Sequence, residues 1–352
     1  MKTFLFLVGF MGFLGLSFFV FQKSFGDTPI SSGNMLSKNQ ENENRDRVSA
    51  EVHIDTNSIP DAVTESPVSF ESRASAAQIL PYKKPNVPNL YIASAHAGII
   101  LDADSGTVLH EFASHEPRQI ASLTKLMTAM ITVEQVKNLD EVVTISEEAV
   151  YAEGTKVGCP RSGFCNGTRL KIGEQISVRN LLKAALMNSA NDAAISLGMH
   201  IGGTQAGFAD IMNKRAAELG LKNTHFCTPS GLELDGRESE CYSSAYDIAH
   251  ITATALQYDV LWEIMRLPKT SITSIDGTLS HDIFNTDALL DQYPNLLGTK
   301  TGFTPLAGYS LLAVATDSTK KHRVVSVVLD DPQRWVDIQQ MFGWAFDSFV
   351  WK

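Results

Sequence analysis

Residues 308–330 have the sequence GYSLLAVATDSTKKHRVVSVVLD, in which two apolar stretches flank the polar segment Asp-Ser-Thr-Lys-Lys. The pattern predicts two β-strands joined by a short turn. Residues 97–112, AGIILDADSGTVLHEF, indicate another strand, an Asp-Ser-Gly turn and a further strand. Strand pairs at both ends of one region predict an antiparallel sheet built from segments that are distant in the sequence.

Between these strand pairs, apolar residues recur at the spacing of amphipathic helices. A break at residues 188–191 separates two of the predicted helices, and Gly220 ends another. This order is an α+β pattern, because it lacks the regular strand–helix alternation of a parallel sheet. The predicted helices cover residues 121–136, 176–187, 191–202, 205–220 and 334–349.

The composition indicates a globular enzyme or binding protein with an additional segment at its N-terminus. Of the 352 residues, 44 % are hydrophobic and 19 % are charged, which is too apolar for a wholly disordered chain and too mixed for a membrane protein with many spans. The formal net charge is −10, and no run of Lys or Arg interrupts the acidic balance. We therefore expect no nucleic acid among the partners, because nucleic-acid-binding proteins usually carry a basic field.

Residues 4–21, FLFLVGFMGFLGLSFFVF, form an almost unbroken apolar run between Lys2 and Lys23. The run is at the short end of the length that spans a bilayer, and it is long for the core of a signal peptide. The triplet Ser24-Phe25-Gly26 offers a cleavage site, although not of the preferred Ala-x-Ala type. We predict that residues 1–26 are a membrane anchor or a removed signal peptide, and both alternatives export the rest of the chain.

Residues 27–88 are rich in Ser, Asn, Glu, Asp and Pro, and no helical or strand period persists in them. This composition predicts a flexible polar linker that ends in a Pro-containing segment. The predicted globular domain is then residues 89–352.

The four cysteines lie in two local pairs. In an oxidising compartment, the disulfides Cys159–Cys165 and Cys227–Cys241 are the simplest of the three connectivities that four cysteines allow. Free thiols are the main alternative. A zinc site is a further alternative, but no His lies at ligand spacing from either pair, so we expect no metal.

Three short motifs carry the candidate chemistry, in the order Ser122-Leu-Thr-Lys125, Ser189-Ala-Asn191 and Lys300-Thr-Gly302. Motifs as short as the first two also arise by chance, and second copies occur at 318–321 and 32–34. Those copies lie in a predicted hairpin turn and in the predicted linker, so we assign them no function.

The residues around Ser122 fit nucleophilic catalysis. Ser122 begins a predicted helix, so Lys125 lies one turn away on the same face, and the helix N-terminus favours a developing negative charge. A serine hydroxyl needs a base to take its proton, and Lys125 can serve when burial and the cation Lys300 lower its pKa. Ser189, at the break between two predicted helices, can pass the proton to a leaving amine.

The third motif suits substrate binding. Lys300 and Thr301 lie on a predicted strand flanked by glycines, which permit a ligand to approach the backbone closely, and they can bind a substrate carboxylate. The backbone N–H groups of Ser122 and Phe303 can form an oxyanion hole. Together these residues predict covalent acyl transfer through a serine ester.

The ordered set of motifs, with steps of about 67 and 111 residues, resembles the active-site serine penicillin-recognising enzymes. Longer stretches narrow this resemblance to the low-molecular-mass D-alanyl-D-alanine carboxypeptidases of serine peptidase family S11. The resemblance covers roughly residues 90–350. The stretches are ASLTKLMTA, KIGEQISVRNLLKAALMNSANDAA, THFCTPSGL, YSSAYDIA and GTKTGFTPLAGY.

The resemblance implies a serine-β-lactamase-like or DD-peptidase-like fold, in which helices flank an antiparallel sheet and form a helical subdomain. It implies removal of the terminal D-Ala from peptidoglycan stem peptides, acylation by β-lactam antibiotics, action outside the cytoplasm and no cofactor. Ser122 is then the nucleophile, Lys125 the base and Ser189 the proton relay. The implied substrate-binding residues are Asn191, Lys300, Thr301, Gly302 and Phe303.

Two features depart from the family pattern. Many relatives carry a β-rich second domain, whereas we expect residues 89–352 to be a catalytic domain with no second β domain. Many relatives also have His directly after Lys-Thr-Gly, where this chain has Phe303. The oxyanion contact of that residue is a backbone N–H, so the substitution affects pocket shape and substrate choice rather than the contact itself.

Other functions can use the same motifs. A D,D-endopeptidase, which cuts peptidoglycan cross-links, differs in what its cleft admits, and the sequence leaves this alternative open. A class A β-lactamase also needs a glutamate that positions the deacylating water, and no Glu-x-x-Leu-Asn segment follows Ser189 at the expected distance. A wall-binding relative without catalysis is disfavoured because all three motifs are intact.

Overall fold

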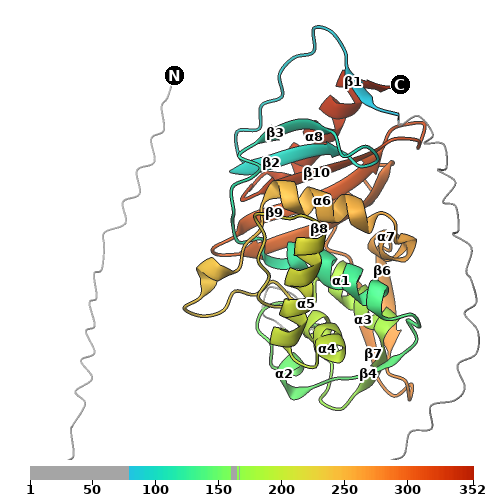
Figure 1. Cartoon of the computed structure of the whole chain (residues 1–352). Coiled ribbons are helices and arrows are strands. Elements are labelled where there is room, and N and C mark those ends of the chain that lie inside the picture. Colours follow the sequence, from blue (N-terminus) through green and yellow to red (C-terminus); the bar gives the residue numbers. More distant parts are fainter. Residues whose placement is uncertain (1–78, 160–164, 166) are drawn as a thin grey trace, which may run out of the picture. The chain divides into compact units, whose positions relative to one another are not determined.

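The protein is described by a computed structural model that places residues 79–159, 165 and 167–352 (Figure 1). The predicted N-terminal anchor or signal segment and most of the predicted linker lie outside the described residues. Within the described part of the chain, no helix combines the length and the apolar character needed to cross a membrane.

The described residues form a main antiparallel sheet of five strands in the order β3-β2-β10-β9-β8. Strands β2 and β10, from the two ends of the globular region, pair directly in this sheet. The predicted α+β class with an antiparallel sheet is therefore confirmed. The strands are β2 (Ala97–Asp102), β3 (Val108–Phe112), β8 (Leu296–Thr304), β9 (Gly308–Thr316) and β10 (Arg323–Leu329).

Both faces of this sheet are buried, and successive residues of a strand serve opposite faces. In β2, Ile99 packs in the apolar cluster that contains the helices of the helical subdomain, whereas Ile100 packs in the cluster formed with the C-terminal helix. Figure 1 shows α6 (Ala245–Ala255) crossing one face, and α8 (Arg334–Ser348) packs on the other. Burial on both sides explains why the strands are continuous apolar runs.

The predicted helices are present, with small differences at their ends. The segment 121–136 begins as the single 3-10 turn η1 (Ala121–Leu123) and continues as α1 (Thr124–Gln135). Residues 175–177 form a short strand, and the next helix begins where the Ser177 hydroxyl accepts a hydrogen bond from the Asn180 N–H. The other predicted helices are α3 (Val178–Met187), α4 (Asn191–Gly202), α5 (Gln205–Glu218) and α8 (Arg334–Ser348).

Several elements have no counterpart among the sequence predictions. They include two antiparallel pairs of short strands, one of which, β4 with β5, has only three residues in each strand and thus too few for a period to be recognised. The elements are β4 (Val142–Thr144) with β5 (Gln175–Ser177), β6 (Lys269–Thr273) with β7 (Ser280–Phe284), α2 (Glu147–Val150), η2 (Glu238–Glu240), α6 (Ala245–Ala255) and α7 (Asp259–Met265).

Ordered strand structure begins before the predicted linker boundary at residue 88. Strand β1 (Pro81–Lys83) pairs antiparallel with β11 (Phe349–Trp351), so the last strand lies beside the chain segment that enters the domain. A three-residue strand carries no detectable alternation, and its partner lies at the other end of the domain. The local composition therefore predicts neither this strand nor its pairing with β11.

Both disulfides connect the local cysteine pairs that the sequence favoured. Cys159 is bonded to Cys165, and Cys227 is bonded to Cys241. Of the described residues, no three His, Cys, Asp or Glu side chains gather closely enough to hold a metal ion.

The packing of α8 predicts a large stability effect. Phe342 is fully buried against the sheet, so Phe342→Ala should lower the free energy of unfolding by about 3–5 kcal/mol through lost burial and a cavity. The matched control is Val336→Ala on the same helix, because Val336 is 60 % exposed and its truncation should change little. Urea unfolding measures both variants, and equal losses would show that α8 does not pack as described.

Candidate active site

Residues of the three sequence motifs meet at one cavity between η1, the turn from α3 to α4, and strand β8. The cavity has a volume of about 180 Å³. Ser122 enters it from η1, Ser189 from the turn between α3 and α4, and Thr301 from β8. Its lining residues are Ser122, Thr155, Asn188, Ser189, Thr286, Thr301, Gly302, Phe303 and Arg334.

Each serine lies at a backbone turn that contains a residue in an uncommon left-handed conformation. Ala121, directly before Ser122, has φ +48°, and Ser189 itself has φ +58°. Each left-handed non-glycine residue costs about 1–3 kcal/mol and persists only where the surroundings impose it. On the facing strand, a Cβ at Gly302 would lie 2.7 Å from the Ile120 carbonyl oxygen, so only glycine lets β8 approach the turn before Ser122 this closely.

The ammonium group of Lys125 has three partners and is fully buried. Its Nζ lies 2.8 Å from Ser122 Oγ, 2.7 Å from Asn191 Oδ1 and 2.7 Å from the Ser230 carbonyl oxygen. Burial, followed by the charge of Lys300, holds the pKa of Lys125 well below its ordinary value. Burial and this neighbouring charge therefore shift the protonation equilibrium of Lys125 toward the neutral amine.

The partners of Lys125 fit a neutral amine that acts as a base. A neutral amine has two N–H donors and one lone pair. The two donors can bond Asn191 Oδ1 and the Ser230 carbonyl, which can only accept, and the lone pair is then directed to the Ser122 hydroxyl. This arrangement orients Lys125 to take the proton from Ser122.

Lys300 connects the third motif to the second. Its buried Nζ donates to Ser189 Oγ at 2.9 Å and to the Thr301 carbonyl at 2.9 Å. Burial, with a smaller contribution from Arg334, lowers the pKa of Lys300 to about 7. Thr301 Oγ1 lies 3.2 Å from Thr286 Oγ1 at the edge of the cavity.

Asn191 lies behind the cavity and is 4 % exposed. Its Oδ1 accepts from Lys125, and its Nδ2 donates to the Glu153 carbonyl at 2.7 Å, so both side-chain atoms have protein partners. The next residue, Asp192, accepts the Val157 N–H at 3.1 Å, and burial raises the pKa of Asp192 to about 6. The start of α4 therefore holds Lys125 and the 153–157 segment.

Phe303 and Arg334 shape the remaining wall of the cavity. The Phe303 ring packs on Tyr309 with 4.6 Å between the ring centres. Arg334 Nη1 donates to the Gly302 carbonyl at 3.1 Å, which places a guanidinium beside the Lys-Thr-Gly strand. Sequence reasoning missed Arg334, because it is the first residue of α8 and belongs to no motif.

The lowered pKa of Lys300 predicts a pH effect on substrates that end in a carboxylate. Lys300 carries its charge below about pH 7 and loses it as the pH rises, so kcat/KM for a D-Ala-terminated peptide should fall above about pH 7. An amidated peptide of the same sequence has no carboxylate to bind, so this alkaline loss should be absent from its kcat/KM profile. Coincident alkaline limbs for the two peptides would remove Lys300 from carboxylate binding.

The fold and the arrangement of this site define a class, that of the penicillin-binding proteins and DD-peptidases. Penicillin-binding protein D2 from Listeria monocytogenes, in its ampicillin-bound form, superposes with a TM-score of 0.61 and 31 % identity, over 74 % of this chain and 99 % of that chain. The family model described as D-alanyl-D-alanine carboxypeptidase, peptidase S11, matches residues 83–333. The chain belongs to this family.

Two curated relatives carry the names of two different activities. The D-alanyl-D-alanine carboxypeptidase DacF of Bacillus subtilis is 32 % identical over 72 % of this chain, and the match spans 63 % of the relative's length. The D-alanyl-D-alanine endopeptidase of Pseudomonas aeruginosa is also 32 % identical, over 74 % of this chain and 78 % of the relative.

Proposed function

We propose that the protein is a serine-type D-alanyl-D-alanine carboxypeptidase that removes the terminal D-Ala from peptidoglycan stem peptides. The observation that carries the proposal is the contact between Lys125 Nζ and Ser122 Oγ at 2.8 Å, in a buried setting that favours a neutral lysine. Such a pair activates a serine hydroxyl without histidine.

The first chemical step is acylation of Ser122. Its Oγ attacks the carbonyl carbon of the penultimate D-Ala while Lys125 takes the hydroxyl proton. Ser122 and Phe303 both line the cavity, and in this proposal their backbone N–H groups stabilise the negative charge of the tetrahedral oxygen. Ser189, hydrogen-bonded to Lys300 at the cavity, gives its hydroxyl proton to the leaving amine of D-Ala and regains a proton from Lys125, which thereby returns to its neutral form.

The second step releases the shortened peptide. Water attacks the acyl-serine carbonyl, Lys125 again takes a proton, and the Ser122 hydroxyl is regenerated. The terminal carboxylate of the substrate is held by Thr301 with the positive charges of Lys300 and Arg334. In this proposal Asn191 acts through Lys125, because both of its side-chain atoms are engaged by the protein.

A D,D-endopeptidase is the second candidate function. It is favoured by the Pseudomonas aeruginosa endopeptidase, because this chain matches a larger share of that relative than of DacF. The chemistry at Ser122 is the same, and the two activities differ in whether the leaving amine belongs to a free D-Ala or to a cross-linked peptide. Mass spectrometry of products from a pentapeptide and from a cross-linked dimer distinguishes them.

We propose that the enzyme acts outside the cytoplasm, on the periplasmic or cell-wall side. The apolar run at residues 4–21 and the two disulfides support export. Membrane attachment through residues 1–26 remains part of this proposal.

Intact-mass spectrometry with benzylpenicillin tests the acyl-serine mechanism. We expect a persistent adduct, one antibiotic per chain, that peptide mapping places on Ser122. Rapid antibiotic destruction without an adduct would assign the protein to the β-lactamases. Neither adduct nor turnover would mean that the three motifs are inert.

A further inference from the structure

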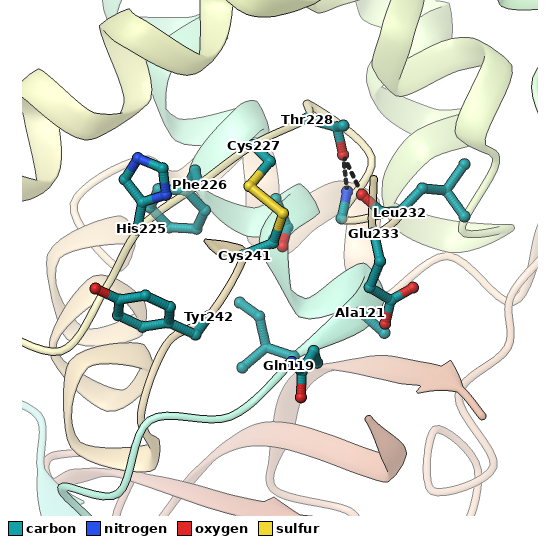
Figure 2. A pocket seen from close by; sticks show the side chains of 13 residues that line it. Gln119, Ala121, His225, Phe226, Cys227, Thr228, Leu232, Glu233, Cys241 and Tyr242 are labelled. Carbon is teal, nitrogen blue, oxygen red and sulfur yellow. Dashed lines mark hydrogen bonds between the residues drawn. A yellow bond between two sulfur atoms is a disulfide. The ribbon is translucent and has the colours of Figure 1, made fainter. Parts of the chain in front are cut away.

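The loop between Cys227 and Cys241 lies behind the nucleophile turn, and the disulfide closes its two ends. Figure 2 shows the disulfide and Ala121, the residue before Ser122, among the residues that line one pocket. A cavity of about 20 Å³, close to the size of one water molecule, separates them. The ends of the loop and the residues before Ser122 therefore line one small cavity.

The first residues after Cys227 hold helix α1. The Ser230 carbonyl accepts from Lys125 Nζ at 2.7 Å, and the Pro229 carbonyl accepts from Thr128 Oγ1 at 2.7 Å. These backbone oxygens can bond α1 only while the loop keeps its present path. One of the three contacts that orient the proposed base thus comes from a disulfide-closed loop.

Gly231 fixes the nucleophile turn from the same loop. It has φ +79°, and a Cβ there would lie 2.0 Å from the Ala121 carbonyl oxygen. This close contact lies against the residue whose left-handed conformation needs support from its surroundings. The Gly231 N–H in turn donates to Thr228 Oγ1 at 3.1 Å, one of the bonds drawn in Figure 2.

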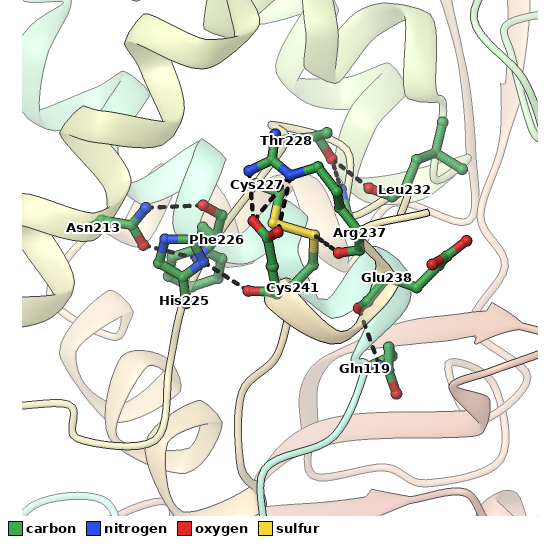
Figure 3. The surroundings of a disulfide bond; sticks show 12 residues. Gln119, Asn213, His225, Phe226, Cys227, Thr228, Leu232, Arg237, Glu238 and Cys241 are labelled. Atoms are coloured by element: carbon green, nitrogen blue, oxygen red, sulfur yellow. Dashed lines mark hydrogen bonds and ion pairs between the residues drawn. A yellow bond between two sulfur atoms is a disulfide. The ribbon is translucent and has the colours of Figure 1, made fainter. Parts of the chain in front are cut away.

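The second end of the loop holds the chain segment that leads into Ser122. Gln119 Nε2 donates to the Glu238 carbonyl at 3.1 Å, as Figure 3 shows. Beyond Cys241, Ser243 and Arg118 exchange backbone hydrogen bonds of 2.8 and 2.9 Å. The first part of the loop therefore contacts Lys125 and, through Gly231, the residue before Ser122. The other end contacts residues 118–119, which lead into the same turn.

The far half of the loop has little apolar packing of its own to keep it in place, whereas Thr228, Pro229 and Ser230 at its start are buried. Its two leucines, Leu232 and Leu234, are only half-buried, and residues 235–237 are exposed. Segments with few buried apolar contacts open at low free energy. The disulfide at the base of the loop links this weakly packed far half to the buried start of the loop.

We propose that the Cys227–Cys241 disulfide is a positioning element of the active site, and that its reduction slows acylation of Ser122 while the domain stays folded. This inference rests on the proposed function. Both cysteines are partly exposed, so a small dithiol can reach them. Dithiothreitol breaks the S–S bond, leaves two cysteine thiols and is itself oxidised to a cyclic disulfide.

The test uses two double variants of the full chain. Cys159→Ser with Cys165→Ser leaves only the Cys227–Cys241 disulfide, and Cys227→Ser with Cys241→Ser leaves only the other. The rate of Ser122 acylation by benzylpenicillin is measured before reduction, after dithiothreitol and after reoxidation. Thiol titration verifies each state, and a thermal melt shows whether the protein is folded.

In the variant that retains Cys227–Cys241, reduction should slow acylation roughly tenfold to a hundredfold, because small displacements of catalytic groups have effects of this size. Reoxidation should restore the rate. In the other variant, acylation should be slow from the start and insensitive to dithiothreitol. The pH at half-maximal acylation should rise on reduction, since a loosened loop exposes Lys125 to water and burial is the main cause of its lowered pKa.

Each remaining outcome is decisive. An unchanged rate in verified reduced protein overturns the inference and leaves the proposed function intact. Loss of the folding transition on reduction also overturns it, because the disulfide would then serve global stability alone. Absence of acylation in the fully oxidised wild-type protein would instead reject the proposed function.

Discussion

Ser122→Ala should abolish covalent labelling by benzylpenicillin and reduce carboxypeptidase turnover on the order of 10⁵-fold or more, because the acyl-enzyme can no longer form. Ser122 is the serine that lies 2.8 Å from Lys125 Nζ and lines the cavity. Removing its hydroxyl leaves the turn and the lysine contacts with Asn191 and Ser230 in place. The measurements are intact mass after incubation with the antibiotic and release of D-Ala from a pentapeptide.

The chain contains its own matched control for this experiment. Ser318 begins the second Ser-x-x-Lys copy, in the exposed turn between β9 and β10. Ser318→Ala should label and turn over like the wild type. A stable adduct on the Ser122→Ala protein would refute the nucleophile assignment, and a loss in Ser318→Ala would show that the assay responds to nonspecific changes.

Lys125→Ala should slow acylation by about 10²–10⁴-fold, the usual contribution of a positioned general base. The substitution leaves Ser122 present but removes the amine that takes its proton. Residual acylation should rise with hydroxide concentration, because solvent must then accept the proton. Stopped-flow or quenched mass measurements of acylation across a pH series provide the readout.

Two controls separate lost basicity from lost structure. Lys321→Ala removes an exposed lysine from the second motif copy and should leave the rate unchanged. A thermal melt of Lys125→Ala verifies folding, since the substitution leaves Asn191 Oδ1 and the Ser230 carbonyl without this donor. Wild-type acylation kinetics in a folded Lys125→Ala protein would exclude Lys125 as the base.

The sequence predicted much of the local structure. Strands β2, β3, β9 and β10 followed from apolar runs and turn residues, and the helices from the period of their apolar positions. Strand β1 and the β4–β5 pair did not, because three residues present no period and their pairing partners lie far along the chain. Helix α6 contains several small or polar residues, which weakens the apolar pattern, and α7 has only seven residues, too few for a helical period to be recognised.

Residues of the candidate site could be named because they belong to motifs, and those without a motif could not. Ser122 and Lys125 are one helical turn apart, so their contact follows from local geometry. The Ser230 carbonyl and Arg334 carry no such signal, since a backbone oxygen is present at every residue and a single arginine is common. The sequence also did not predict that Asn191 is buried, with its amide bonded to Lys125 and to the Glu153 carbonyl.

The amino-acid sequence by itself determined the α+β class, the local cysteine pairing that it favoured and the order of the three motifs, because these depend on residue type and short spacing. Only the tertiary structure decided that β2 lies beside β10, that Lys300 reaches Ser189 across 111 residues, and that the Cys227–Cys241 loop contacts the turn before Ser122. Such contacts arise when distant segments bury their apolar faces together, and no short window of sequence encodes which segments will meet.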